Sequence, residues 1–159
     1  PEETGNTLFE NALLKARTYF ELTKLPTLSD DSGLFVEILN GEPGVHSARF
    51  AGKSVTYTDN RRKLKEIIED KVDPITAYFA TVIAIVTQKG EWTFEGRCNG
   101  TILREDRGTN GFGYDPMFVP EGSQRTFAEM TNAEKNLISH RSVAFNLFIK
   151  AFTEKQIVF

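Results

Sequence analysis

The chain has 159 residues, of which 40% are hydrophobic and 26% charged, so it can bury the core of one domain and is not a disordered chain. Its 19 basic and 22 acidic residues give a net charge of −3, which argues against a nucleic-acid partner because such proteins present basic surfaces. No apolar run reaches the roughly 20 residues that cross a bilayer, so no membrane partner is expected. The single Cys98 cannot form an internal disulfide, which favours a cytoplasmic location.

The first expected element is a helix that follows Thr7 and runs to about Leu22. Thr7 and Glu10 are spaced as a capping box. The apolar stripe of this helix would consist of Leu8, Phe9, Ala12, Leu13, Ala16, Tyr19 and Phe20. Asn11 and Lys15 are four residues apart, so they share one face at the border of the stripe. Lys15 either runs along the surface with its ammonium in water or points into a cleft beside the core.

Two adjacent acids, Asp30 and Asp31, are predicted to lie in a turn between short strands at 27–29 and 34–39. Two interpretations remain open at this point. Asp, Ser and Gly are ordinary residues of a solvated turn. Alternatively, a fold retains paired carboxylates where a cation neutralises them, and Mg²⁺ takes carboxylate oxygens together with substrate phosphates.

From about Asp59 to Lys71 the sequence predicts a helix with Leu64, Ile67 and Ile68 as its inner face. Its charged residues are predicted to form a solvated face: Arg61, Arg62, Lys63, Lys65, Glu66 and Glu69. The run 75–87 is apolar on both strand faces, which predicts a central strand covered on both sides. A hairpin turn at 88–91 leads into a strand at 92–97, and a third strand is expected near 101–104. Long strands flanked by helices indicate an α/β or α+β architecture with a mixed sheet.

The segment 106–116 is rich in glycine and contains Phe112, Tyr114 and Asp115. Glycines let the backbone approach a ligand closely, and aromatic faces beside a hydrogen-bond acceptor suit a flat heterocycle. The other interpretation is a glycine-rich hairpin whose aromatic rings simply pack. The sequence leaves both open.

Two further capping boxes, at 126–129 and 131–134, precede a last helix that is expected to begin at Ser139. The apolar stripe of that helix would consist of Val143, Ala144, Leu147, Phe148, Ala151 and Phe152. His140 and Arg141 then lie in its first turn, with Lys135 just before it. Because cations are unfavourable at a helix N-terminus, these side chains indicate an anion or a carbonyl oxygen that satisfies them. Alternatively, all three are surface residues and His140 is neutral.

Six segments together resemble a known family in their order and spacing. They are Glu2-Glu3-Thr4-Gly5, Glu10-Asn11-Ala12 with Lys15-Ala16, Ser29-Asp30-Asp31-Ser32-Gly33-Leu34, Pro43-Gly44-Val45-His46-Ser47-Ala48-Arg49, Gly111-Phe112-Gly113-Tyr114-Asp115-Pro116 and Ser139-His140-Arg141. Over essentially the whole chain they resemble the Ham1-type inosine/xanthosine triphosphate pyrophosphatases. The resemblance implies an α/β fold with an elongated mixed sheet, flanked by helices in two lobes with a central cleft, and a homodimer.

The resemblance also implies a Mg²⁺-dependent hydrolase that converts ITP, dITP or XTP to the monophosphate and pyrophosphate. By position, Asp31 matches the general base and a metal ligand, and Glu3 matches a second metal position. Substrate-binding roles are implied for Asn11, Lys15, Ser32, Phe112, Gly113, Tyr114, Asp115, Lys135, His140 and Arg141. Among these, Lys15 would reach the phosphates, and Lys135, His140 and Arg141 would read the 6-oxo edge of the purine. Asp30 is expected to support the turn by accepting backbone hydrogen bonds.

One departure concerns the start of the chain. The family opens with a strand and a Ser/Thr-x-Asn-x-x-Lys loop that grips the triphosphate, and residues 1–159 begin after that position. The single domain 1–159 is therefore expected to lack that strand and loop, and by itself to bind triphosphate weakly and hydrolyse it slowly, unless the missing piece exists in the molecule. Two alternatives remain: a Maf-like pyrophosphatase of different base preference, or a non-catalytic nucleotide-binding module. The Ser-His-Arg and Phe-Gly-Tyr-Asp segments argue against the first, and the acidic balance and the paired Asp30 and Asp31 argue against the second.

Overall fold

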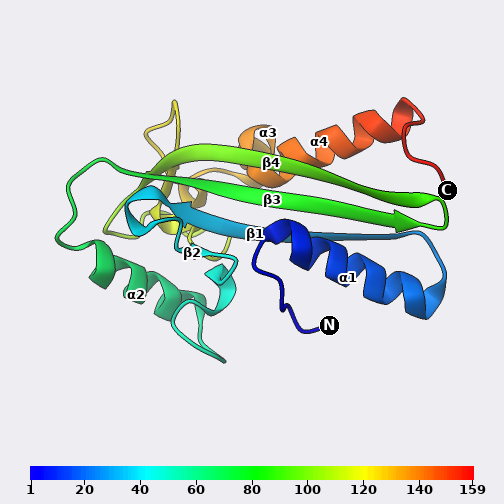
Figure 1. Cartoon of the computed structure of the whole chain (residues 1–159). Coiled ribbons are helices and arrows are strands. Elements are labelled where there is room, and N and C mark those ends of the chain that lie inside the picture. The colour runs from blue at the N-terminus through cyan, green and yellow to red at the C-terminus, as the bar shows by residue number, and fades with distance from the viewer. The chain divides into compact units, whose positions relative to one another are not determined.

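The computed structural model describes residues 1–159, and its helices and strands are drawn in Figure 1. In chain order they are α1 (Leu8–Thr23), β1 (Thr27–Val36), β2 (Pro43–Gly44), α2 (Tyr57–Ile68), β3 (Ile75–Thr87), β4 (Gly90–Ile102), β5 (Phe118–Pro120), α3 (Asn132–Ile138) and α4 (His140–Thr153). Short 3-10 helices lie at Glu37–Leu39, Ser47–Arg49, Asp115–Met117 and Phe127–Glu129. None of the helices combines the length and the apolar character that a membrane span requires.

The five strands form one sheet in the order β2-β1-β3-β4-β5. The pairs β1/β2 and β4/β5 are antiparallel, with Leu34 opposite Gly44 and Thr101 opposite Val119. The arrows of β1 and β3 also point in opposite directions, and β3 and β4 form a hairpin (Figure 1). The predicted α/β class, a long sheet with flanking helices, is confirmed, but the strands run antiparallel where we expected a mixed sheet.

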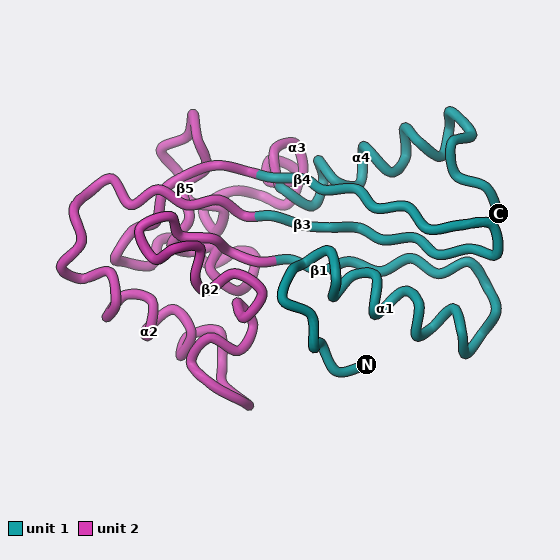
Figure 2. Tube along the Cα trace, in the orientation of Figure 1, with its two compact units in different colours: residues 1–32, 80–97, 140–159 teal, residues 33–79, 98–139 magenta.

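The chain folds as two compact units, coloured separately in Figure 2. Unit 1 contains residues 1–32, 80–97 and 140–159, and unit 2 contains residues 33–79 and 98–139. Strands β1, β3 and β4 contribute residues to both units, so each unit is built from segments that are distant in sequence. Each unit has its own buried apolar cluster.

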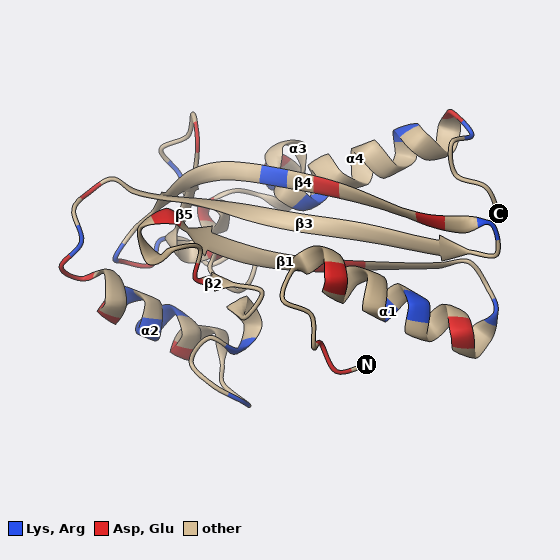
Figure 3. Cartoon of the chain, viewed as in Figure 1, with Lys and Arg blue, Asp and Glu red and all other residues tan.

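The central strand predicted at 75–87 is confirmed as β3. Most of its residues are buried, and both parities are apolar, as expected for a strand covered on both faces. Figure 3 shows that no charged residue interrupts it. The charged residues are instead carried by the helices, the loops and the strands beside it.

The predicted acidic turn is wrong. Asp30 and Asp31 lie in the middle of β1, which runs without interruption from Thr27 to Val36. Successive side chains of a strand point to opposite faces, so the two adjacent carboxylates diverge and find separate partners. A polar strand centre is stable here because those partners come from helices that are distant in sequence, and local propensity does not report them. Likewise, the two strands expected at 92–97 and 101–104 are one strand, β4.

The predicted start residues of the helices agree with the structure better than the predicted apolar stripes do. The capping boxes of Thr7, Thr56, Thr126 and Thr131 are all formed; three had been expected, and that of Thr56, at the start of α2, is additional. α4 begins at His140, one residue after the expected start, because Ser139 is the C-cap of α3. Several residues assigned to apolar stripes are exposed instead: Phe9, Tyr19, Ile67, Val143, Leu147 and Phe152.

In unit 1, α1 and α4 cover opposite faces of the sheet (Figure 2). The Ser29 hydroxyl donates to the Ala12 carbonyl of α1 at 2.5 Å, so this side chain faces α1. On the other face, α4 lies directly against Gly96 of β4. A Cβ built at Gly96 would lie 2.2 Å from the carbonyl oxygen of His140 and 2.3 Å from the backbone nitrogen of Ala144. The first turn of α4 therefore depends on the absence of a side chain at this position.

We expect the Gly96→Ala substitution to destabilise the protein by about 1–3 kcal/mol, because two backbone atoms must move to admit the methyl group. Alanine ordinarily stabilises a strand interior by about 0.5–1 kcal/mol relative to glycine, so the overlap has to outweigh that gain. Urea unfolding gives the free energy directly. Glu95→Ala, at an exposed neighbour, is the control and should stay within about 0.5 kcal/mol of the wild type. An unchanged stability for Gly96→Ala would contradict the close packing.

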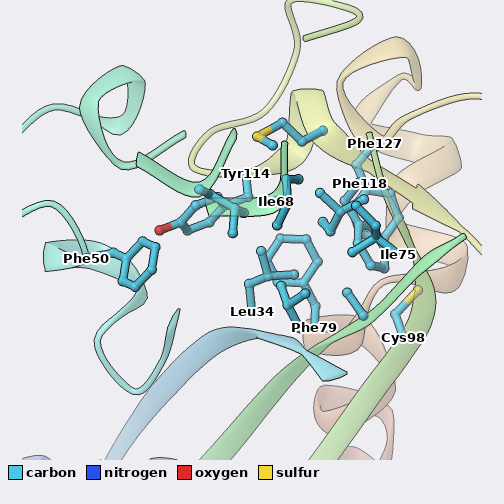
Figure 4. Packing of buried hydrophobic residues seen from close by; sticks show 14 of the residues in the cluster. Leu34, Phe50, Ile68, Ile75, Phe79, Cys98, Tyr114, Phe118 and Phe127 are labelled. Atoms are coloured by element: carbon cyan, nitrogen blue, oxygen red, sulfur yellow. The ribbon is translucent and has the colours of Figure 1, made fainter. Parts of the chain in front are cut away.

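The core of unit 2 is built around aromatic side chains (Figure 4). Phe118 and Phe127 are fully buried, with ring centroids 5.0 Å apart, and Phe79 contacts both at 4.7 and 6.0 Å. Leu34 and Ile75 bring the ends of two strands into the same cluster. This cluster supports the segments that carry the predicted base-binding residues.

Candidate active site

A lysine between two carboxylates is the most distinctive polar feature of unit 1. The Lys15 Nζ donates to Oε1 of Glu3 at 2.8 Å and to Oδ1 of Asp31 at 2.8 Å. Lys15 comes from α1, Asp31 from β1 and Glu3 from the segment before α1. Three residues that the sequence analysis singled out for phosphate and metal chemistry are thus in direct contact.

Asn11 joins this group from the same face of α1, as its spacing from Lys15 predicted. Its Nδ2 donates to Oδ2 of Asp31 at 3.4 Å, and its Oδ1 accepts from the backbone N–H of Gly5 at 2.8 Å. Asn11 is fully buried, so these two hydrogen bonds fix the approach of the N-terminal segment to α1. Gly5 lies two residues after Glu3, whose own carboxylate is held by Lys15.

Burial and charge act in opposite directions on this group. Burial raises the pKa of Asp31 above its ordinary value, and the hydrogen bond from Lys15 opposes that shift. Burial alone would lower the pKa of Lys15, but its hydrogen bonds to Asp31 and Glu3 more than compensate and raise it. A carboxyl group whose pKa is raised is a stronger proton acceptor than an ordinary aspartate.

The carboxylates of Glu3 and Asp31 also fit a hard divalent cation. Both offer oxygen to one point, which Lys15 occupies as a positive charge. The structure contains no cluster of three or more His, Cys, Asp or Glu side chains suited to a metal. Mg²⁺ is commonly bound by one or two carboxylates and completes its shell with water and substrate phosphates. Glu3 and Asp31 are therefore the residues that would hold Mg²⁺.

Asp30 faces α4, on the opposite side of β1. Its Oδ2 accepts from Nε and Nη2 of Arg141 at 3.2 and 3.0 Å. Ser32, on the same face, accepts from Arg141 at 3.3 Å and shares a hydrogen bond of 2.6 Å with the buried Thr81 of β3. The anion expected beside the first turn of α4 is thus Asp30. Its carboxylate binds the side chain of Arg141, whereas we predicted that it would accept hydrogen bonds from the backbone.

His140 is buried at the start of α4, so the interpretation of this residue as a surface side chain is wrong. It lies where α4 packs against Gly96, and its carbonyl oxygen is one of the atoms closest to that glycine. The backbone of His140 and the guanidinium of Arg141 are therefore held by two different contacts of the same helical turn.

Unit 2 holds the predicted base-binding segment. Oδ2 of Asp115 accepts from the backbone N–H of Phe112 at 2.9 Å and from Nζ of Lys135 at 2.5 Å. Gly111 has a φ of +73°, and a Cβ there would lie 2.0 Å from the same carboxylate oxygen, which explains the need for glycine. Asp115 thereby organises the turn that carries Phe112.

The two aromatic residues of this segment differ in exposure. One of them packs, as in an ordinary glycine-rich hairpin, and the other is available to a flat ligand. Tyr114 is buried, and its hydroxyl donates to the carbonyl oxygen of Ser47 at 2.9 Å, so it packs and anchors. Burial also raises the pKa of the Tyr114 hydroxyl, which stays protonated. Phe112 is 52% exposed and offers a ring face. Gly113, between them, has a φ of +61° and open space where a side chain would point.

Lys135 lies between two aromatic rings. Its Nζ is 5.1 Å from the centroid of Phe112 and 5.1 Å from that of Phe127. It belongs to the last turn of α3 and so lies before the last helix, α4, as the sequence predicted. The predicted residues are thus assembled as two groups: Glu3, Asn11, Lys15, Asp31, Ser32, His140 and Arg141 in unit 1, and Phe112, Gly113, Tyr114, Asp115 and Lys135 in unit 2.

Arg61 is a further residue of this group that the sequence did not indicate, since it was expected on a solvated face of α2. Its side chain is 15% exposed and donates to the carbonyl oxygen of Gly113 at 2.8 Å. A signal was present, because Arg61 precedes the buried Leu64 and Ile68 by three and seven residues and so shares their face. Thr81 was also missed, since it appears within an apolar strand as an ordinary β-branched residue.

Comparison with known proteins places these features in a family. The model of the Ham1 family matches residues 1–151. A dITP/XTP pyrophosphatase of Thermoanaerobacter pseudethanolicus is 50% identical, with 97% of this chain and 80% of that protein covered. A dITP/XTP pyrophosphatase of Porphyromonas gingivalis is 50% identical over 89% of this chain and 73% of that protein.

A solved structure gives the same result. A HAM1 protein from Coxiella burnetii superposes with a TM-score of 0.92 at 45% sequence identity, covering 97% of this chain and 80% of that chain. The resemblance drawn from six short segments is therefore confirmed over nearly the whole chain. This chain belongs to the Ham1 family.

Proposed function

We propose that this chain hydrolyses deaminated purine nucleoside triphosphates, namely ITP, dITP and XTP, to the nucleoside monophosphate and pyrophosphate. The observation that carries the proposal is the Glu3–Lys15–Asp31 group, in a chain 50% identical to a relative named dITP/XTP pyrophosphatase. Two carboxylates and one ammonium at a single point suit the positioning and neutralisation of phosphate charge.

In the proposed reaction, a water molecule attacks the α-phosphorus of the substrate. As the water oxygen bonds to phosphorus, Asp31 accepts a proton from the water. The raised pKa of Asp31 favours that proton transfer. The bond between the α-phosphorus and the α,β-bridging oxygen breaks, and pyrophosphate leaves with the electron pair. Lys15 faces the phosphate charges. Mg²⁺ held by Glu3 and Asp31 would screen the phosphates and polarise the bond that breaks.

The stacking partner of the base would come from unit 2, with the exposed ring of Phe112 stacked on the purine. Lys135, His140 and Arg141 are proposed to recognise the 6-oxo group, as the family resemblance implies. GTP carries the same oxygen, so these residues alone do not explain a preference for ITP over GTP.

Further aspects of the proposal rest on the resemblance and on composition. We propose Mg²⁺ as the metal, a homodimer as the assembly and the cytoplasm as the location. The buried Cys98 supports only the last of these, because a lone cysteine suits a reducing compartment.

Pyrophosphate release from ITP, XTP and GTP with Mg²⁺ tests the proposal. We expect IMP and pyrophosphate from ITP without free phosphate, faster turnover of ITP and XTP than of GTP, and loss of turnover when EDTA removes the metal. Binding that survives EDTA without any product would instead support a non-catalytic nucleotide-binding module. Preference for a different base class would support the Maf-like alternative.

A further inference from the structure

A set of contacts in unit 2 joins helix α2 to the segment that carries Phe112 and Gly113. The guanidinium of Arg61 donates from Nε to Oδ2 of Asp106 at 3.0 Å and from Nη1 to the carbonyl oxygen of Gly113 at 2.8 Å. Asp106 is the first residue of the glycine-rich segment 106–116, and Gly113 lies within it, next to Phe112. One side chain of α2 therefore bridges two separate points of the segment.

The guanidinium is itself held in place. Its Nη2 donates to Oγ1 of Thr58 at 3.3 Å, and Lys65, one turn further along α2, contacts Oδ1 of Asp106 at 2.9 Å. Although burial acts against the charged form, the hydrogen bonds from Lys65 and Arg61 lower the pKa of Asp106, so it is ionised at neutral pH. Planar guanidinium groups with several fixed partners are well suited to holding a backbone in one geometry.

Other parts of the segment are also held from outside, because the backbone N–H groups of Thr109 and Asn110 donate to the carbonyl oxygen of Ala128 at 3.1 and 3.0 Å. Gly108, Gly111 and Gly113 have φ values of +85°, +73° and +61°, and glycine loses more conformational freedom on folding than any other residue. Tyr114 and Asp115 fix the side of the segment that faces the core, whereas the carbonyl oxygen of Gly113 is held by Arg61.

A second contact brings α2 to the same place. Tyr57, in the first turn of α2, has its ring centroid 6.2 Å from that of Phe112, and both rings are about half exposed. Helix α2 thus contacts the ring of Phe112 through Tyr57, and the backbone carbonyl of the next residue, Gly113, through Arg61. Both contacts of α2 are made at the Phe112–Gly113 turn, so the effect of α2 is expected on base binding.

We propose that Arg61 is a positioning residue for base recognition, which holds the Phe112–Gly113 turn in its binding geometry by bridging Asp106 and the Gly113 carbonyl. This inference rests on the proposed function, in which Phe112 stacks on the purine. A residue that acts only through the base-binding turn should affect the KM for the substrate and leave the chemical step unchanged.

The test compares three variants: Arg61→Ala, Arg61→Lys and Arg62→Ala. We expect Arg61→Ala to raise the KM for ITP about tenfold, the effect of losing a charged hydrogen bond, and to change kcat less than about twofold. Arg61→Lys keeps the positive charge but lacks the planar guanidinium group with its several donors, so it should give an intermediate KM. Arg62, exposed on the same helix and paired with Asp59, is the matched control and should have the KM of the wild type.

Two further measurements separate positioning from general instability. Thermal unfolding should show all three variants folded at the assay temperature. Hydrogen exchange should be faster at the Phe112 and Asp115 amides of Arg61→Ala, and unchanged at amides of β3. A folded Arg61→Ala variant with the KM of the wild type would overturn the inference, as would an equal rise in Arg62→Ala. If the wild type does not hydrolyse ITP, the proposed function fails instead, and the exchange experiment still decides whether Arg61 holds the turn.

Discussion

Replacing Asp31 by Asn should lower kcat for ITP about a thousandfold, within the range expected when a positioned general base is lost. The substitution keeps the size and shape of the side chain, so the strand and its packing are preserved. It removes the proton acceptor and one of the two carboxylates that contact Lys15. Steady-state release of pyrophosphate under saturating ITP and Mg²⁺ measures the effect. A kcat within threefold of the wild type would exclude Asp31 as the base.

The adjacent Asp30 provides a stringent comparison, because Asp30→Asn makes the same chemical change one residue away. Asp30 pairs with Arg141 on the other face of β1, and both side chains are more than 40% exposed. Exposed ion pairs contribute about 0.2–1 kcal/mol, so the KM for ITP should rise by no more than about fivefold, with kcat nearly unchanged. Equal losses of kcat in the two variants would show that activity depends on the total charge of Asp30 and Asp31. The face of β1 on which each carboxylate lies would then be unimportant.

The separation of Asp30 and Asp31 onto opposite faces of β1 could be predicted from the sequence only in part. Turn composition and the carboxylate pair were visible in the sequence, and so was the resemblance that distinguishes Asp31 from Asp30. The continuous strand was not visible, because residues 29–32 are all polar and a strand prediction depends on apolar alternation. Their partners, Ala12, Lys15, Thr81 and Arg141, come from three other elements, so only the tertiary structure shows that each polar side chain is satisfied.

Features with a local physical cause were predicted well. The capping box at Thr7, the shared face of Asn11 and Lys15, and the doubly apolar strand at 75–87 each depend on spacing within one element. Arg61 was misassigned because a charged residue on a helix is usually solvated, although its spacing from Leu64 put it on the inner face. The partner that accounts for its burial is a backbone carbonyl, at Gly113, and the sequence gives no sign of a backbone acceptor.

The second large effect is expected at Phe127, one of the two rings that flank Lys135. Phe127→Ala should lower the free energy of unfolding by about 3–5 kcal/mol, because it removes a fully buried ring packed on Phe79 and Phe118 and leaves a cavity. That is a substantial part of the 5–15 kcal/mol or so that stabilises a typical domain. Chemical denaturation measures it, and a loss below about 1 kcal/mol would contradict the packing of this core.

Phe112→Ala is the matched variant, because Lys135 lies at the same 5.1 Å from both ring centroids. Phe112 is half exposed, so its loss should change stability by no more than about 1 kcal/mol. It should nevertheless raise the KM for ITP about tenfold, as expected when a base loses a stacking partner. If the cation–ring contact itself governed Lys135, the two variants would impair binding alike. A loss of stability in Phe127→Ala together with a loss of affinity in Phe112→Ala would separate the two roles. It would show that Phe127 supports Lys135 from the core and that Phe112 presents its ring to the substrate.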